Sequence, residues 1–170
     1  MPTVRNIKAI LGIEEWDAYT WTNPASRGAN VVITYSFSGG SNLDRFGGSE
    51  FPGASFHKFT SAQQRNFKTA LEEFEDTTGI RFVETSGRAM INVARAQGTD
   101  TGGFANYPFT TEDESDGVFS ELVIDGTGSF GKGSYEYQAM LHEIGHAVGL
   151  SHPHEGYYKL ANSLDNINQT

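Results

Sequence analysis

Residues 142–153 read HEIGHAVGLSHP, and this stretch decides how the rest of the chain is interpreted. His142 and His146 are four positions apart, so on a helix both imidazoles lie on one face, about one turn apart. Both side chains can therefore reach a single metal ion. Glu143 follows the first histidine and points beside the metal, where its carboxylate can accept a proton from a bound water.

The third histidine needs a change in chain direction, because a helix alone cannot bring it to the same metal. Gly149 permits a sharp turn, since glycine tolerates the left-handed conformation at a helix C-terminus. His152 then folds back, and Pro153 prevents the helix from resuming. Three neutral imidazoles and one water complete a tetrahedral catalytic zinc site. The spacing H-E-x-x-H-x-x-G-x-x-H therefore predicts that His142, His146 and His152 bind one Zn²⁺, with Glu143 as the catalytic base.

Two further histidines and two tyrosines are interpreted as neither metal ligands nor catalytic residues. His57 lies in FPGASFHKF without a partner at metal spacing, which favours a surface or loop position. His154 follows the third histidine closely and is assigned to the rim of the site. Tyr135 and Tyr137 are interpreted as packing residues at the start of the zinc helix. The chain has no cysteine, so any metal site must use His, Asp or Glu.

Composition indicates one loop-rich globular domain over residues 1–170, with 37% hydrophobic residues, 19% charged residues and 20 glycines. The formal charge of −9 argues against nucleic acid or an anionic membrane as partner, because both require clustered Lys and Arg. No apolar run approaches the roughly 18 residues of a membrane span. The start, MPTVRNIKAILGIEEW, does not have the pattern of a secretory signal peptide. We expect a cytoplasmic protein, or one exported without an N-terminal signal.

Hydrophobic periodicity predicts an α/β (α+β) fold. Ser61 and Gln64 have capping-box spacing at the start of one helix, and Gly79 ends it. Residues 38–55 are rich in Gly and Ser and are predicted to be a loop. Helices are predicted at residues 4–11, 61–78 and 134–149, and strands at 30–37, 80–86, 89–96, 102–108 and 120–126.

Calcium is an alternative ligand that the sequence does not support. GGSNLD, residues 39–44, partly resembles a glycine-aspartate nonapeptide of β-roll proteins, but it occurs once and such repeats need about three copies to stack. A Gly-Ser loop is the favoured interpretation. EDESD, residues 112–116, could hold a cation, but charge runs usually stay hydrated, which favours a solvated loop.

The stretch HEIGHAVGLSH resembles the signature of the metzincin zinc endopeptidases. With LSHP and the preceding GSYEYQAMLHEIGH, it is similar to the serralysin branch in particular. A looser likeness follows the order Trp21, VVITYSF, a helix with Gln64 and Ala70–Leu71, GIRFVE and ANYP. The resemblance covers most of the chain and is strong over residues 131–153.

The resemblance implies a metzincin-like N-terminal subdomain with a twisted, mostly parallel five-stranded sheet and an antiparallel edge strand. Two long helices would pack on this sheet, with the zinc helix at a cleft. The edge strand, here Gly103, Phe104, Ala105, Asn106 and Tyr107, would pair with an extended protein or peptide substrate. The family also implies a secreted bacterial endopeptidase that leaves the cell by a C-terminal export signal.

The chain departs from the family after the third histidine. Metzincins have a methionine turn there, but Met1, Met90 and Met140 all precede or lie within the zinc helix. Serralysins add a metal-reaching tyrosine, a β-roll and the export signal. We favour a domain incomplete at its C-terminus, whose partner is the rest of its own chain. The alternatives are a complete peptidase with a minimal site and a non-catalytic zinc-containing binding or structural module.

Overall fold

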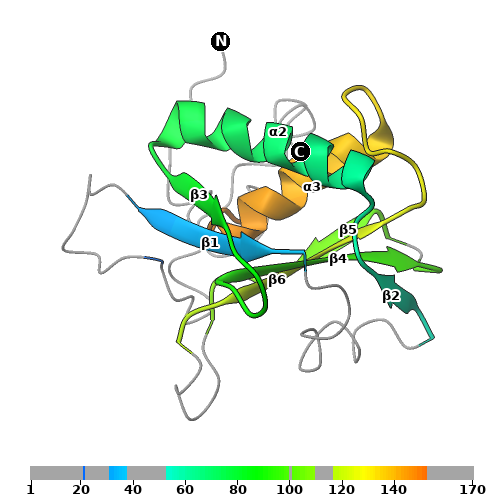
Figure 1. The fold of residues 1–170 in the computed structure, drawn as a ribbon, viewed down its shortest axis with the longest axis horizontal. Coiled ribbons are helices and arrows are strands. Elements are labelled where there is room, and N and C mark those ends of the chain that lie inside the picture. The colour runs from blue at the N-terminus through cyan, green and yellow to red at the C-terminus, as the bar shows by residue number, and fades with distance from the viewer. Residues whose placement is uncertain (1–20, 22–30, 38–52, 100, 110–116, 153–170) are drawn as a thin grey trace.

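The computed structural model describes Trp21 and residues 31–37, 53–99, 101–109 and 117–152 (Figure 1). The predicted helix at 4–11, the loops at 39–44 and 112–116, Pro153 and His154 lie outside the described residues. In chain order, the elements are β1 (Val32–Ser36), β2 (Ser55–His57), α2 (Ser61–Thr78), β3 (Arg81–Glu84), β4 (Ile91–Gln97), β5 (Gly103–Ala105), β6 (Ser120–Asp125) and α3 (Tyr135–Ala147).

The strands form one sheet in the order β3-β1-β4-β6-β5, with β2 paired to β4 off this path. Strands β3, β1, β4 and β6 are parallel, whereas β5 runs antiparallel to β6 at one edge. The prediction of a mostly parallel α/β sheet with an antiparallel edge strand is therefore confirmed. The number of strands is six rather than five.

The additional strand is β2, at the end of the stretch predicted to be a loop. It pairs antiparallel with the C-terminal half of β4, and Phe56 packs against Ala94, Ala96 and Val123. Three residues are too few to show alternation, and the partner strand lies far along the chain, so local sequence gives no signal. His57 is exposed, as predicted, although it lies in a strand.

Both helices pack on the same face of the sheet (Figure 1). On α3, Met140 and Ile144 are fully buried in this core. Residues two positions apart on a helix point in nearly opposite directions, so this burial turns His142 and His146 away from the core. The sheet contributes Ile33, Tyr35, Ile91, Val93, Leu122 and Ile124, and the helices contribute Phe67, Ala70, Leu71, Tyr137, Ala139, Met140, Ile144 and Ala147.

The cap of α2 lies one residue earlier than predicted. Thr60 Oγ1 accepts a hydrogen bond from the Gln63 backbone N–H at 3.3 Å, and Gln63 Oε1 accepts one from the Thr60 N–H at 2.9 Å. Sequence spacing alone cannot separate this pair from Ser61 and Gln64. The helix ends before Gly79, which has φ 75° as a left-handed cap requires.

The loop between β6 and α3 is anchored to α2, and this anchoring positions the start of α3. Gln63 Nε2 donates to the Gly128 carbonyl at 2.6 Å, and Asn66 Nδ2 donates to the Ser129 carbonyl at 2.8 Å. Phe130 is 1% exposed and its ring packs edge-on against Phe59, although its backbone has φ 60°. Burial of the ring thus offsets a conformation that bulky residues rarely adopt.

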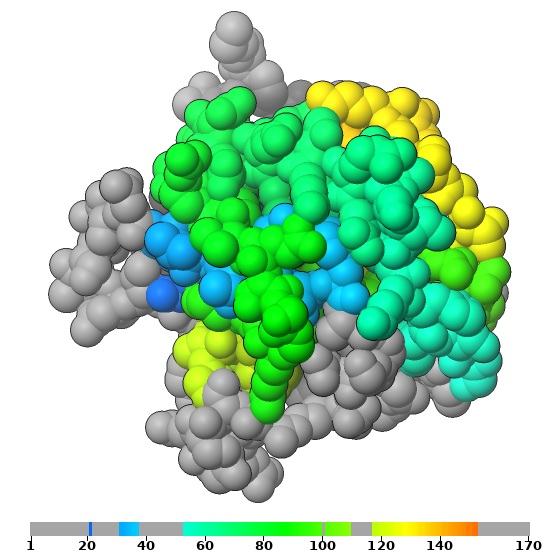
Figure 2. Space-filling model, viewed as in Figure 1, coloured from blue at the N-terminus to red at the C-terminus, as the bar shows by residue number. Residues whose placement is uncertain are grey.

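The space-filling view shows α2 and β3 spread over the blue atoms of β1, which remain visible only in part (Figure 2). Within β1, Ile33 and Tyr35 are buried whereas Val32 is exposed, so the strand is covered on its helix side. Neither helix of the described residues is long and apolar enough to cross a membrane.

Candidate metal centre

Helix α3 is held at both ends. Ser134 Oγ accepts a hydrogen bond from the Tyr137 backbone N–H at 3.1 Å, which caps the N-terminus. At the other end, the Trp21 indole Nε1 donates to the Ala147 carbonyl at 2.8 Å. Tyr137 also donates its hydroxyl hydrogen to Glu73 Oε1 on α2 at 2.9 Å. These contacts fix the position of the histidine-bearing face relative to the sheet.

The predicted turn at Gly149 is confirmed. Gly149 has φ 101°, and its N–H donates to the His146 carbonyl at 2.8 Å. The Leu150 N–H donates to the Gly145 carbonyl, also at 2.8 Å. This pair of bonds is the Schellman pattern, which reverses the chain while satisfying the last helical carbonyls. His152 therefore returns toward the helix that carries the other two histidines.

The three imidazoles converge at their Nε2 atoms. His142 and His152 are separated by 2.9 Å, and His146 lies 3.0 Å from each of them. A tetrahedral zinc ion with bonds of about 2.0–2.1 Å separates its ligand nitrogens by roughly 3.3–3.4 Å. Small side-chain rotations therefore open the triangle to that size. Within the described part of the chain, this is the one group of three ligand-type side chains that could share a metal ion.

Three features of the structure act on these histidines. His146 Nδ1 lies 2.8 Å from the Leu150 carbonyl and donates to it, which leaves Nε2 as the atom that faces the other imidazoles. The Tyr107 ring packs edge-on against the His146 ring, with centroids 5.4 Å apart. Partial desolvation lowers the pKa of His142, and His152 lowers it further. Both effects favour the neutral imidazole, which is the form that binds metals.

Glu143 is almost completely buried between α3 and β5, with 7% of its surface exposed. Burial raises the pKa of Glu143 to about 7, while a hydrogen bond from the Ala105 backbone N–H acts in the opposite direction. The strand comes very close to this side chain. A Cβ atom at Gly103 would lie 2.9 Å from Glu143 Cγ and 2.9 Å from the Val123 carbonyl oxygen. Glycine at position 103 therefore permits the carboxylate to sit against the strand.

The segment predicted to bind substrate is only partly a strand. Gly103, Phe104 and Ala105 form β5, and Asn106 still donates to the Glu121 carbonyl on β6 at 3.1 Å. Tyr107 leaves the sheet and reaches His146. The register pairs Phe104 with Val123, and in an antiparallel ladder alternate residues bond to the neighbouring strand. The backbone groups of Gly103 and Ala105 consequently point away from β6.

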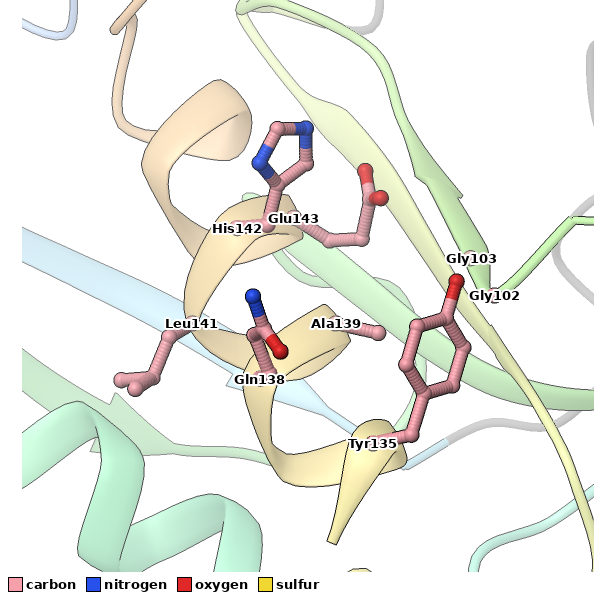
Figure 3. Close-up of a pocket in the computed structure, with 8 residues that line it drawn as sticks. All are labelled: Gly102, Gly103, Tyr135, Gln138, Ala139, Leu141, His142 and Glu143. Atoms are coloured by element: carbon pink, nitrogen blue, oxygen red, sulfur yellow. The ribbon is translucent and has the colours of Figure 1, made fainter. Parts of the chain in front are cut away.

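A hollow of about 500 Å³ lies between β5 and α3, beside Glu143 (Figure 3). It shows that the packing interpretation of Tyr135 is wrong, because this side chain is 68% exposed and lines the hollow. The same interpretation is confirmed for Tyr137, which is 6% exposed. The adjacent glycines Gly102 and Gly103, at the start of β5, are the sequence signal that was missed, since a glycine in this position can mark a place where another group lies close to the backbone. The hollow is lined by Gly102, Gly103, Tyr135, Gln138, Ala139, Leu141, His142 and Glu143.

The fold and the site define a mostly parallel α/β domain with a histidine group that could bind a metal at the cleft below an antiparallel edge strand. No protein-family model matches the sequence. The chain is 30% identical over 149 residues to serralysin B of Dickeya chrysanthemi, covering 80% of this chain and 29% of that protein. It is also 30% identical over 147 residues to serralysin A of the same organism, covering 81% and 30%.

A third similarity, to metalloprotease AprA of Pseudomonas entomophila (strain L48), shows 29% identity over 106 residues and covers 58% of this chain and 21% of that protein. The matched region is therefore less than a third of the length of each of these relatives. Together the comparisons support a serralysin-like relationship.

Proposed function

We propose that this chain acts as a zinc-dependent endopeptidase of the metzincin type, which hydrolyses peptide bonds in extended protein substrates. The observation that carries the proposal is the convergence of three Nε2 atoms within 3.0 Å of one another, on the helix that also carries the buried Glu143. The names of the relatives, two serralysins and a metalloprotease, support the same assignment. By the same relationship, we propose that it acts outside the cell.

The donor set fits zinc. His142, His146 and His152 offer three neutral nitrogens, and such sets hold catalytic zinc with one coordination position left open. The hydrogen bond from His146 Nδ1 to Leu150 supplies the outer-shell partner that zinc-binding histidines usually have. When bound, zinc lowers the pKa of a coordinated water to about 7 and polarises a substrate carbonyl.

Glu143 moves the proton in the proposed reaction. Its carboxylate accepts a proton from the attacking water as the oxygen–carbon bond forms, and it delivers that proton to the amide nitrogen as the carbon–nitrogen bond breaks. A pKa of about 7 suits both steps, because the group is near the midpoint between its two protonation states at neutral pH. The Ala105 N–H orients the carboxylate from the strand side.

The edge strand β5 would hold the substrate. The outward-facing backbone groups of Gly103 and the outward carbonyl of Ala105 are positioned to pair with an extended peptide, as in strand addition to other sheet edges. Such pairing recognises the main chain, so protein substrates of varied sequence can bind. The side chains of the substrate would then be selected by the hollows beside the strand.

The variant Glu143→Ala tests this proposal. We expect hydrolysis of casein to fall by roughly 10²–10⁴-fold while zinc remains bound, because the histidine ligands are unchanged. Zinc content by mass spectrometry and casein cleavage would be measured on the same preparation. Near-normal turnover in this variant would contradict the role of Glu143. Zinc binding without cleavage by either the wild-type chain or the variant would instead favour a non-catalytic zinc-containing module.

A further inference from the structure

The C-terminal end of α3 carries the turn on which the histidine group depends. The Leu150 carbonyl, which accepts a hydrogen bond from His146 Nδ1 at 2.8 Å, belongs to this turn, and His152 follows two residues later. The turn therefore sets the orientation of the second histidine and the position of the third. Any contact that fixes the turn also fixes the distances between the three Nε2 atoms.

The carbonyl groups at this end of α3 have different partners. Backbone N–H groups of the turn donate to the carbonyls of Ile144, Gly145 and His146. The next carbonyl, that of Ala147, accepts a hydrogen bond at 2.8 Å from the indole of Trp21, a residue 126 positions earlier in the chain. Trp21 thus supplies a donor to the carbonyl of the last helical residue, a group for which the helix itself has none.

The bond between Trp21 and Ala147 is sheltered from water. Ala147 has no exposed surface, and Trp21 is half-buried against the same core. A buried carbonyl without a partner is unfavourable, because no hydrogen bond then offsets its desolvation. Without the indole N–H, the chain would relieve this cost by moving the end of α3 toward another donor or toward solvent. Such a movement displaces the turn.

We propose that Trp21 is a positioning residue for the metal centre. Its indole N–H holds the Ala147 carbonyl, and through it the turn at Gly149, so that the three histidines meet without rearrangement when a metal binds. This inference rests on the proposed zinc site. It adds that the affinity for the metal is set in part by a residue that lies before β1 and is itself no ligand.

The effect on affinity follows from the coupling between the turn and the metal. The metal-bound chain must keep the turn in place, because all three histidines are ligands. The metal-free chain can relax when the Ala147 carbonyl loses its donor, and the relaxed chain must then return to the binding conformation. The cost of the lost hydrogen bond therefore appears as weaker metal binding.

The test measures zinc affinity, so that it does not depend on turnover. Competition with a chromophoric chelator would give the zinc Kd of the wild-type chain, Trp21→Phe and Ser134→Ala. Trp21→Phe keeps an aromatic ring at the core but has no hydrogen to donate to Ala147. Ser134→Ala is the matched control, because it removes the hydrogen bond of 3.1 Å to the Tyr137 N–H at the other end of the same helix. Circular dichroism would check that each chain is folded.

We expect Trp21→Phe to weaken zinc binding by roughly 5- to 140-fold, the range for a buried carbonyl that loses its partner. Ser134→Ala should lower the midpoint of urea unfolding, because the helix loses its N-cap. Its zinc Kd should change by less than about 2-fold, since the substitution is distant from the turn.

Two further measurements separate the hydrogen bond from packing. Replacing Trp21 by benzothienylalanine keeps the bicyclic ring and puts sulfur in place of the N–H group, so zinc binding should weaken as in Trp21→Phe. In the wild-type chain, zinc should slow the exchange of the Trp21 indole hydrogen with solvent, because coupling between two sites acts in both directions. NMR would follow this signal, which is assigned by its absence in Trp21→Phe.

Wild-type zinc affinity in the benzothienylalanine chain, or in folded Trp21→Phe, would overturn the role of Trp21. An equal loss of affinity in Ser134→Ala would overturn it as well, because the effect would then be one of general stability. A wild-type chain that binds no zinc would reject both this inference and the proposed function. The expected affinities in a chain that cleaves no protein would support Trp21 as a positioning residue and reject only the proposed hydrolysis.

Discussion

Each of the two helices in the described part of the chain buries one polar side chain, and the two side chains differ in their hydrogen bonds. Gln63 on α2 has no exposed surface, and both ends of its amide are hydrogen-bonded, to Thr60 and to Gly128. Glu143 on α3 is also buried, but its resolved partner is a single backbone N–H and its pKa is raised to about 7. A buried polar group with complete partners stabilises a fold, whereas a buried acid with a displaced pKa indicates chemistry.

The buried carboxyl of Glu143 should make the stability of the chain depend on pH, whereas the uncharged amide of Gln63 should not. The pKa of Glu143 is raised from 4.5 to about 7 in the folded state, so between these values the native chain binds more protons than the unfolded chain. Stability contributed by protonated Glu143 is therefore present below pH 4.5 and lost as the pH rises through 7. In the metal-free wild-type chain, we expect ionisation of Glu143 to lower the free energy of unfolding by about 3 kcal/mol between pH 4.5 and pH 7. The variant Glu143→Gln should not show this decrease.

Urea unfolding of the metal-free wild-type chain and of Glu143→Gln at several pH values would measure this. The difference between their free energies of unfolding should grow from pH 4.5 to pH 7 and then level off. A difference that does not change with pH would mean that the carboxylate is not desolvated in the fold.

The contact between the edge strand and Glu143 can be broken from the strand side. A Cβ in Gly103→Ala would meet both Glu143 Cγ and the Val123 backbone at 2.9 Å, so the strand or the carboxylate must move. We expect kcat/KM for a peptide substrate to fall by about 10²-fold, because displacing a catalytic group by about 1 Å has an effect of this size. Gly98→Ala, in a turn with no atom near the added Cβ, is the control for activity, although its φ of 88° makes some loss of stability expected. Equal activity in both variants would contradict a tight contact at Gly103.

The structural role of Gln63 can be tested by converting it into the acid found on the other helix. Gln63→Glu keeps an acceptor for the Thr60 N–H but faces the Gly128 carbonyl without a hydrogen to donate. We expect a loss of about 1–3 kcal/mol in the free energy of unfolding. Asn66→Asp removes the neighbouring bond to Ser129 at an exposed position, and it should change stability by less than about 0.5 kcal/mol. Similar losses in both variants would show that burial of Gln63 is unimportant.

The parts of the fold that could be predicted depend on local sequence. The helix at 134–149 was visible because its apolar residues recur at helical spacing, and the turn at Gly149 because few residues other than glycine adopt φ 101°. The grouping of His142, His146 and His152 follows from these two local features. The sequence also predicted strands at the positions of β1, β3, β4, β5 and β6, and a helix at the position of α2.

The parts that were missed depend on contacts between distant residues. Strand β2 pairs with β4, which lies more than 30 positions later in the chain, and Gln63, the residue that completes the cap of α2, also donates a hydrogen bond to the distant Gly128 carbonyl. Tyr135 was interpreted as a packing residue at the start of the helix, but its side chain is 68% exposed and lies next to Gly102, which is distant in sequence. None of these partners is near in sequence, so periodicity and spacing could not identify them.

The most direct test of the central claim is the zinc content of the purified chain, measured with casein cleavage before and after treatment with a chelator. The account predicts close to one zinc ion per chain, loss of cleavage when the zinc is removed, and recovery of cleavage when zinc is restored. A chain that binds no zinc at the three histidines, or cleavage that persists without it, would contradict the account.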